Sequence, residues 1–446
     1  MNIKNCIIVF SLLWVSVSHA YPWMFFRERN DSDIIRLDSH ASYFFDKEVS
    51  FFSGLDLNYH NPMLDLDLGY IYSHLENNHY FRLSELSVNF PLPWNKWIMS
   101  IGFQNILWSE LDRYWNYGLW QARFLLDPLR TEQMGMPGLS FRYKTIKSSF
   151  ILLFSYLQLP DFQIYPEFID NRVSSRNPLF KSTQGVNVNK LSSELFKLEK
   201  FLKPGLAFQL KHSIDSLHLN FSYAYKGMNQ LKKAFLFKGF SPLKSSSISL
   251  EEFNYFSLYH ELSSLEAELE FSPTFSLFAG VFYEEPKDKK IPKDWWSSDF
   301  SSHLTFSVLA YFKEHWDNSQ NTLFTLGGTH IQEEKTSFNS NVLTDDYKKL
   351  FSREFDWKSA ISASVEHENK NFYKGILFRF RTIYALDNQV YHFMFENYLY
   401  FDDYIRFYLS GDFVRRFSQR VVLVESSSIK RYNGLSRILL GVQCVF

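Results

Sequence analysis

The sequence predicts an all-β protein, a single antiparallel β-barrel of about 16–20 strands, even in number, that crosses a membrane. Three observations predict it. Apolar and polar residues alternate with a period of two in many short runs, and aromatic residues make up 19% of the chain. The longest purely apolar run after residue 20 is Phe150–Phe154, which is far too short for a membrane-spanning helix.

Residues 1–20 have the three parts of a secretory signal: a short polar start with Lys4, an apolar stretch, and a small-residue cleavage site that ends at Ala20. We expect cleavage after Ala20 and one barrel domain over 21–446. The cleaved chain keeps Cys444 as its single thiol. This excludes an intramolecular disulfide framework and a multi-cysteine metal site.

The charge balance excludes one class of partner. Lys and Arg number 47 against 48 Asp and Glu, which gives a formal net charge of −1 and no global basic field. We therefore expect no nucleic-acid partner. The chain has no Pro, Gly or Ser linker and no charge block that would divide it into domains, and we expect no cofactor and no metal site.

The alternation is clearest in four runs. In 64–73 the leucines and tyrosines fall on one face, and the aspartates fall on the other. The runs 217–226, 265–271 and 405–413 repeat the pattern. Successive side chains of a strand point to opposite faces, so each run would form a strand with one apolar and one hydrophilic side.

Applied to the whole chain, this pattern predicts about twenty strands. Merging the weak ones leaves 16 or 18, and bacterial single-chain barrels use even numbers. The predicted strands are 33–45, 51–60, 64–73, 80–91, 97–106, 138–146, 149–158, 205–213, 216–226, 232–240, 253–262, 265–272, 274–283, 302–313, 321–331, 357–367, 371–383, 389–401, 403–413 and 434–446.

The last run, Gly434–Phe446, ends on an aromatic residue and carries its apolar residues on one face. It resembles the terminal strand of Gram-negative outer-membrane β-barrel proteins, in which a final Phe and the alternating apolar residues before it are read by the assembly machinery. The resemblance implies a bacterial outer-membrane location after secretion, contact with outer-membrane lipid and lipopolysaccharide, and the barrel-assembly machinery as a partner. The assembly signal would comprise Ile438, Leu440, Val442 and Phe446.

Counting strands backwards from the C-terminus assigns each loop to one side of the membrane, because successive strands run in opposite directions. With Phe446 in the periplasm, the long connections fall on the outer side and the short ones, such as 61–63 and 92–96, fall on the inner side. The long connections are 107–137, 159–204, 284–301, 332–356 and 414–433.

The connection 107–137 is unusually apolar for a loop, because it contains three tryptophans. We expect it to fold back into the barrel mouth as a constriction or plug, with Arg113, Arg123 and Arg130 as solute contacts. Two extra strands or a helical cap on the rim is the alternative.

The predicted inward face carries both signs of charge. Glu266, Glu268 and Glu270 follow one strand, and Arg379 and Arg381 follow another. If the two rows faced each other, they would form the transverse field of a general porin, and Arg406 would add a further solute contact. The alternative is a packed interior of paired charges with no path through it.

The leading functional hypothesis is a channel or export barrel that passes hydrophilic solutes or polysaccharide. The first alternative is a surface-assembly or adhesive barrel that binds glycan through its outer loops while its lumen stays closed. The second is an outer-membrane hydrolase, although the sequence has no nucleophile elbow and no zinc-protease motif. The local clusters to inspect would be 366–368 and 328–330. The sequence leaves open whether the chain forms a homo-oligomer.

Overall fold

The computed structural model describes most of the predicted barrel. The described residues are 35–44, 50–73, 77–93, 96–125, 129–163, 167–169, 172–174, 186–191, 202–236, 248–287, 295–296, 301–317, 320–333, 357–371, 374–387, 389–401, 405–416 and 436–445. The predicted signal, residues 1–20, and the terminal Phe446 lie outside them. Within this part of the chain, no helix is long and apolar enough to cross a membrane.

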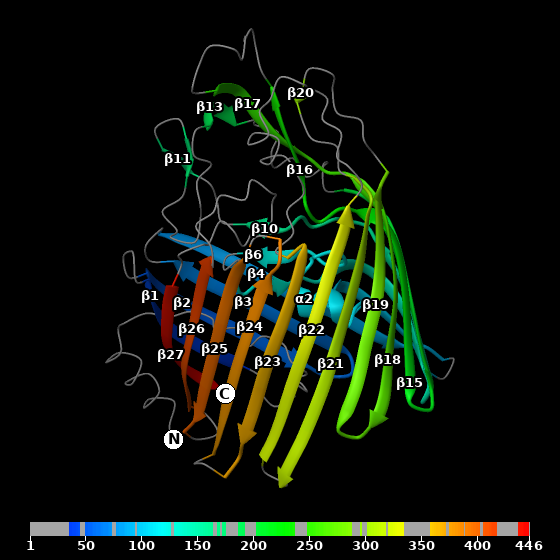
Figure 1. The fold of residues 1–446 in the computed structure, drawn as a ribbon. Coiled ribbons are helices and arrows are strands. Elements are labelled where there is room, and N and C mark those ends of the chain that lie inside the picture. The colour runs from blue at the N-terminus through cyan, green and yellow to red at the C-terminus, as the bar shows by residue number, and fades with distance from the viewer. Residues whose placement is uncertain are drawn as a thin grey trace.

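Eighteen strands form one antiparallel sheet, in which every strand pairs with two neighbours (Figure 1). In order around the sheet they are β1 (Ile35–Phe44), β2 (Ser50–His60), β3 (Leu64–Ser73), β4 (Asn78–Pro91), β5 (Trp97–Gln104), β8 (Met136–Lys144), β9 (Ser148–Ser155), β14 (Gly205–Ile214), β15 (Leu217–Gly227), β18 (Tyr259–Ser272), β19 (Phe275–Pro286), β21 (His303–Asp317), β22 (Gln320–Glu333), β23 (Ser359–Asn369), β24 (Gly375–Ala385), β25 (Val390–Tyr400), β26 (Ile405–Arg416) and β27 (Ser436–Val445).

The sheet closes on itself between its first and last strands. β1 and β27 are antiparallel, in a register that runs from Arg36 opposite Val445 to Phe44 opposite Arg437. Closure removes the free edges that an open sheet would present to lipid, where no water could satisfy the exposed backbone groups. The predicted all-β barrel with an even strand number is confirmed.

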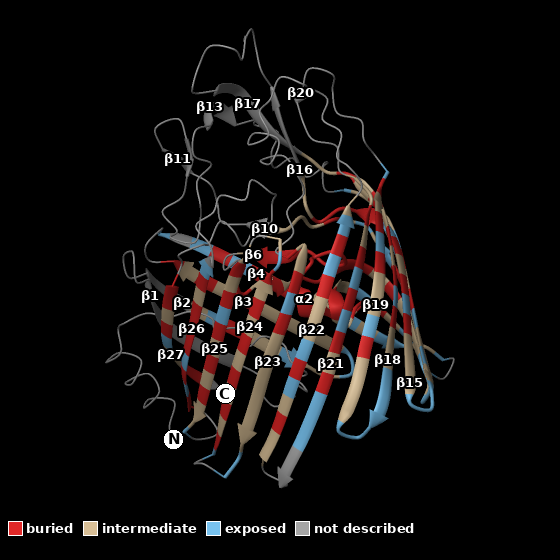
Figure 2. Cartoon of the chain, viewed as in Figure 1, coloured by how far each residue is buried: buried red, intermediate tan, exposed pale blue. Residues whose placement is uncertain are grey.

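Side chains alternate between a polar lumen and an apolar outer surface, as Figure 2 shows by the red and pale bands along the strands. Leu326 and Leu440 point outward and are 54% and 60% exposed, whereas Arg437, beside Leu440 on the other face, is 2% exposed. Large apolar side chains are exposed in this way on strands around the barrel. Such a surface is stable in hydrocarbon and costly in water.

The connections differ in length between the two ends of the barrel. The long ones leave the end opposite the labelled termini, where a second, six-stranded sheet lies beyond the barrel (Figure 1). Its order is β11 (Glu167–Ile169), β12 (Arg172–Ser174), β13 (Val186–Leu191), β17 (Ile248–Phe256), β16 (Lys232–Leu236) and β20 (Trp295–Trp296). Because bacterial barrels carry their longer loops on the outer side, we call this end the outer end.

Two strand predictions need correction. The run 232–240 is not a barrel strand, because β16 belongs to the six-stranded sheet. The runs 253–262 and 265–272 are not two barrel strands, because β18 continues unbroken through Ser263 and Ser264. These two changes bring the predicted twenty strands to eighteen.

Candidate functional site

Residues 105–135 connect β5 to β8, and we call them the lumen segment; its described parts, 105–125 and 129–135, lie inside the barrel. Trp108, Trp115 and Trp120 are each at most 1% exposed. They belong to the main hydrophobic core, together with apolar side chains that face inward from the wall, such as Phe282 and Leu309. Burying three indole rings removes a large apolar area from water, which accounts for the position of so apolar a connection.

A short helix, α2 (Glu110–Trp115), begins the lumen segment. The Ser109 hydroxyl caps it by accepting a hydrogen bond from the Asp112 backbone N–H at 2.8 Å, and Asn116 ends it in a left-handed conformation with φ 56°. The Asp112 carboxylate then accepts the backbone N–H of Leu119 at 3.1 Å and of Trp120 at 3.4 Å. Burial raises the pKa of Asp112 to about 6.

Opposite charges on the wall hold the two ends of α2. Glu266 on β18 accepts hydrogen bonds from the Ser109 hydroxyl and from the Leu111 backbone N–H. Arg381 on β24 donates to the Tyr114 carbonyl at 3.0 Å, and its guanidinium lies 4.2 Å from the centroid of the Tyr114 ring. A carboxylate at the start of a helix and a cation at its end both complement the helix dipole.

Neutral hydrogen bonds attach the same half of the segment to other strands. The Trp108 carbonyl accepts from Asn220 at 2.9 Å, and it also accepts from Gln209 and Ser222. The Tyr114 hydroxyl lies 2.7 Å from the Ser362 hydroxyl. We call residues 105–122 the helical half of the lumen segment.

Residues 123–135, which we call the strand half, contain β6 (Arg123–Leu125) and β7 (Glu132–Gln133). These strands form a small sheet with β10 (Phe162–Gln163). Arg123 donates to Asp161 at 2.9 Å from Nη2. Glu132 pairs with Arg82 on β4, which also reaches Asp67 on β3 and Asp56 on β2.

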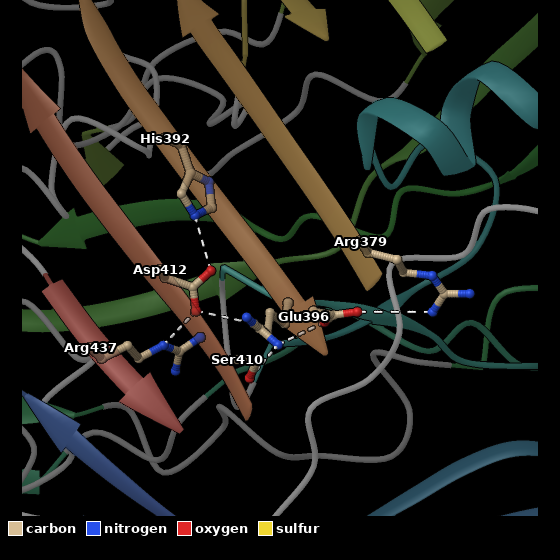
Figure 3. Close-up of polar contacts among 7 residues, drawn as sticks. Arg379, His392, Glu396, Ser410, Asp412 and Arg437 are labelled. Atoms are coloured by element: carbon tan, nitrogen blue, oxygen red, sulfur yellow. Dashed lines mark hydrogen bonds and ion pairs between the residues drawn. The ribbon is translucent and has the colours of Figure 1, made fainter. Parts of the chain in front are cut away.

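Arg130 joins a network of buried charges on the C-terminal strands, whose members Glu396, Asp412 and Arg437 are labelled in Figure 3. Its guanidinium donates to Glu396 at 2.7 Å and to Asp412 at 3.0 Å, and these carboxylates are at most 2% exposed. Asp412 also accepts from Arg437 at 2.7 Å and lies 3.2 Å from His392. The network therefore joins the strand half to β25, β26 and β27 through buried charges, each of which has a partner of opposite sign.

The predicted solute contacts have distinct surroundings. Arg123 and Arg130 are buried against protein carboxylates, whereas Arg113 is half-buried on α2. Arg379 pairs with Glu366 at 2.7 Å. Arg406 is buried, with its guanidinium 5.1 Å from the Tyr400 ring centroid.

The two predicted charge rows do not face each other across an open lumen. Glu266 and Arg381 hold the two ends of α2, which lies between them. Glu268 is half-buried, and Glu270 is exposed with its carboxylate 3.4 Å from the His218 ring. Only the first position of the glutamate row therefore reaches the lumen segment through a described hydrogen bond.

The described part of the predicted assembly signal alternates as expected. Ile438 and Val442 are half-buried and Leu440 is exposed, on the outward face of β27. Cys444, on the same face, is buried beside Ile405 and Val442. Whether the assembly machinery reads these residues stays a prediction.

Residues 366–368 and 328–330 were the two local clusters that could have formed a hydrolase site, and their described contacts are to side chains of neighbouring strands. Glu366 pairs with Arg379, and the His367 ring lies 3.0 Å from the Thr322 hydroxyl. His330 is exposed on the outer surface, 2.7 Å from Ser359. Among the described residues, no group of three or more His, Cys, Asp or Glu side chains is placed to hold a metal ion.

Sequence reasoning missed three residues that organise the lumen. Arg82 of the wall pairs with Glu132 of the lumen segment, and His392 joins the Asp412 network. Their alternation with outward apolar residues, such as Phe81 beside Arg82 and Phe393 beside His392, was the available signal for the two strand positions. Glu132 lies outside any alternating run, so no such signal existed for it.

No protein-family model matches the chain, and no curated protein sequence matches it. Among solved structures it is similar to Wzi of Escherichia coli, described as an outer-membrane protein involved in group 1 capsule assembly and as a carbohydrate-binding β-barrel. That likeness has a TM-score of 0.48 and 10% identity, over 93% of this chain and 85% of Wzi.

The chain is also similar to OpdK of Pseudomonas aeruginosa, with a TM-score of 0.47 and 8% identity over 92% of this chain and 97% of that one. OmpT of Vibrio cholerae matches with a TM-score of 0.37 and 10% identity, over 94% and 100% of the two chains. Both are described as outer-membrane proteins. The chain's own closed sheet and apolar outer surface are those of a membrane-spanning β-barrel.

Proposed function

We propose that this chain is a surface-assembly or adhesive barrel, which binds glycan at its outer face while its lumen stays closed to hydrophilic solutes. The observation that carries the proposal is the packing of the lumen segment. It has polar contacts to β4, β14, β15 and β18 on one side. It has others to β21, β22, β23, β24, β25 and β26.

A channel needs polar side chains that are free to replace the hydration shell of a solute. Here the buried charges nearest the lumen segment are already matched by protein groups, as Arg130 is by Glu396 and Asp412. The rest of the interface is apolar core, including Trp115 and Leu309. If the lumen is closed, the outer end of the barrel is the surface on which a ligand can bind.

Two features of that outer end support glycan as the ligand class. The long connections there form a sheet of their own beyond the end of the barrel. One of its edge strands, β20, consists of Trp295–Trp296 and pairs with Phe235 and Leu236 of β16. As a residue type, tryptophan combines an apolar ring with a polar N–H, so the sequence of this strand favours a ligand with the mixed surface of a sugar.

Conductance in planar bilayers tests the closed lumen. The full chain should give only background current, whereas a general porin in the same bilayers should give steady open steps. A variant in which a short Gly-Ser linker replaces 107–134 should conduct, provided that heat-modifiable mobility on gels shows that it is folded. Steady conductance of the unmodified chain would contradict the proposal.

If the unmodified chain did conduct, the Glu266/Glu268/Glu270→Gln variant would then test the predicted transverse field through its reversal potential.

Binding of the full chain to a glycan array, in a detergent without a sugar head group, tests the second part of the proposal. Absence of binding to every glycan on an array that includes bacterial surface polysaccharides would contradict it.

A further inference from the structure

Two outer connections meet the lumen segment at the outer end of the barrel. The first, residues 156–204, joins β9 to β14, and the second, residues 228–258, joins β15 to β18. Both carry strands of the six-stranded sheet: β11, β12 and β13 on the first, and β16 and β17 on the second. Figure 1 shows β10 of the first connection close to β6 of the lumen segment, with which it pairs. The connections therefore link the outer sheet to the interior of the barrel.

Asp161 of the first outer connection is buried against Arg123 of the lumen segment. Its side chain is 3% exposed, and its carboxylate accepts hydrogen bonds from the Arg123 backbone N–H at 2.8 Å, from Nε at 3.2 Å and from Nη2 at 2.9 Å. The next residues continue the contact as a parallel pair, with Phe162 opposite Phe124. Charge-assisted hydrogen bonds between buried groups are strong, so this contact holds β6 to the first connection.

Arg123 extends this contact to the end of α2. Its Nη1 donates to the carbonyl of Asn116, the residue that caps the helix, at 2.9 Å. Gly118 makes room for the guanidinium, because a Cβ atom at this position would overlap Arg123 Nε. Gly118 also has φ 68°, a conformation that glycine adopts without strain. A single arginine therefore joins Asp161 to the end of the helix.

Asn229 of the second outer connection binds the same stretch. Its side-chain amide is buried and donates to the carbonyls of Gly118 at 2.9 Å and Leu119 at 3.1 Å. Its own carbonyl accepts the backbone N–H of Asp161 at 2.9 Å. The two outer connections thus contact each other and residues 116–125 of the lumen segment.

We propose that these contacts form a latch, through which the outer connections hold residues 116–125 in place and keep the lumen closed. The rest of the lumen segment is held by barrel strands, for example by Glu266 and Arg381 at α2 and by Glu396 at Arg130. Those strands cannot move without breaking the closed sheet. The outer connections are not part of the barrel wall, so they can leave 116–125 while the barrel stays intact.

Release of the latch should open the lumen only briefly. Tyr117 keeps its contact with the Ser307 hydroxyl, and Trp120 keeps its stacking on Trp108 in the core. These contacts return the stretch to its closed position after each local opening. Released protein should therefore show short current steps, in contrast to the long openings of a general porin.

The outer sheet is the natural origin of such a release. β10 ends at Gln163 and β11 begins at Glu167, so the link between them reaches at most about 14 Å. A ligand that draws β11 away from the barrel would therefore pull on β10 and Asp161. The inference rests on the closed lumen of the proposed function and adds the contact through which it opens.

Conductance of full-chain Asp161→Ala protein in planar bilayers tests the latch. We expect brief open steps at a rate at least about tenfold above that of the unmodified chain, because the buried Arg123 loses its carboxylate partner. The matched control is Glu333→Ala, which removes another carboxylate at the outer end, paired with Lys358 at 2.6 Å within the wall. The control should give only background current.

The outcomes separate the latch from the proposed function. Background current from both the unmodified chain and folded Asp161→Ala protein would overturn the latch and leave the proposed function in place. Equal rates of open steps in Asp161→Ala and Glu333→Ala would also overturn the latch. Steady conductance of the unmodified chain would overturn the closed lumen on which both depend. If Asp161→Ala does not fold, Asp161→Asn keeps the side-chain volume, removes the charge and carries the same expectation.

Hydrogen exchange locates the opening. In Asp161→Ala protein the amides of 117–125 should exchange at least about tenfold faster than in the unmodified chain, while those of 110–115 should keep their rates. Unchanged exchange in 117–125, or equally faster exchange in both stretches, would overturn the inference.

A double variant tests whether Arg123 and Asp161 act together. Arg123→Ala removes the same contact from its other side, so Arg123→Ala/Asp161→Ala should open no more often than Arg123→Ala alone. If the two substitutions multiplied each other's effect on the rate of open steps, they would act independently, and the inference would be overturned.

Discussion

The two halves of the lumen segment are held in the barrel by different forces. The helical half, residues 105–122, packs three indole rings into the core and makes mostly neutral hydrogen bonds to the wall. The strand half, residues 123–135, is attached by ion pairs of Arg123, Arg130 and Glu132. The stability gained from apolar packing does not depend on pH. A buried ion pair, in contrast, destabilises the fold when either partner is removed or loses its charge.

This difference predicts how each half will respond to mutation. Losing an apolar group from the helical half leaves a cavity, and its cost depends on the volume that the neighbours cannot fill. Losing a charge from the strand half removes one partner of opposite sign from each buried charge that it contacts. The effects below are changes in the free energy of unfolding from detergent micelles, measured with urea.

The largest effect should come from Arg130→Ala. It removes the cation between Glu396 and Asp412 and should lower the stability by about 3–5 kcal/mol, because both carboxylates are almost fully buried. Arg415→Ala, on the exposed end of β26, is the control and should stay within about 0.5 kcal/mol of the unmodified protein. Equal stabilities of the two variants would remove the distinction between the halves.

Leu111→Ala tests packing in the helical half. Leu111 is fully buried against Gly280 of β19, where a Cβ atom would lie 2.6 Å from its Cδ1. We expect a loss of about 2–5 kcal/mol that does not change with salt, because no charge is involved. Leu386→Ala, at a half-exposed turn position, is the control. A strongly salt-dependent loss would argue against packing as the cause.

Two carboxyl groups are exceptions to pH insensitivity in the helical half, because burial raises the pKa of both Glu110 and the more deeply buried Asp112. The folded-state pKa of Asp112, about 6, lies above the ordinary value of 3.8, so the folded state holds this proton more firmly than the unfolded state. The stabilising contribution of Asp112 is therefore complete below about pH 3.8 and is lost as the pH rises through 6, a change on the order of 2–3 kcal/mol.

Hydrogen exchange at the amides of Leu119 and Trp120 measures this effect. After correction for intrinsic rates, both amides should be better protected at pH 5 than at pH 7.5. Asp112→Asn should remove that dependence, since the amide does not titrate in this range. The same pH dependence in Asp112→Asn protein would assign it to another group.

The smallest effect should come from Tyr117→Phe. The Tyr117 hydroxyl lies 2.7 Å from Ser307 and also contacts Thr329. Ser307 and Thr329 are 2.9 Å apart and can satisfy each other when the phenol is lost. We therefore expect a loss of about 1 kcal/mol, and a loss above about 3 kcal/mol would show that the two hydroxyls depend on Tyr117.

The barrel strands were predictable because each one repeats a local pattern. The run 64–73 was predicted with the bounds that β3 has, since its leucines and tyrosines alternate with polar residues without a break. In β18, by contrast, Ser263 and Ser264 read as a turn, although Ser264 faces the polar lumen, where serine is expected. The pattern cannot distinguish a polar inward position from a loop residue.

The contacts of the lumen segment could not be predicted in the same way. Alternation indicates that Asp412 faces inward, but Arg130 is 282 residues away in the sequence. Their pairing depends on the strand order, the closure of the sheet and the path of the lumen segment together. The apolar composition of 107–137 indicated that it avoids water, without indicating which strands it meets.

The seam between β1 and β27 has a consequence for biogenesis. Both ends of the lumen segment are covalently fixed to the wall, at β5 and β8, while Arg130 meets β25 and β26, which only β27 follows in the chain. The ion pairs of Arg130 therefore cannot form before these C-terminal strands have joined the sheet. Once β27 pairs with β1, the wall surrounds the segment on every side.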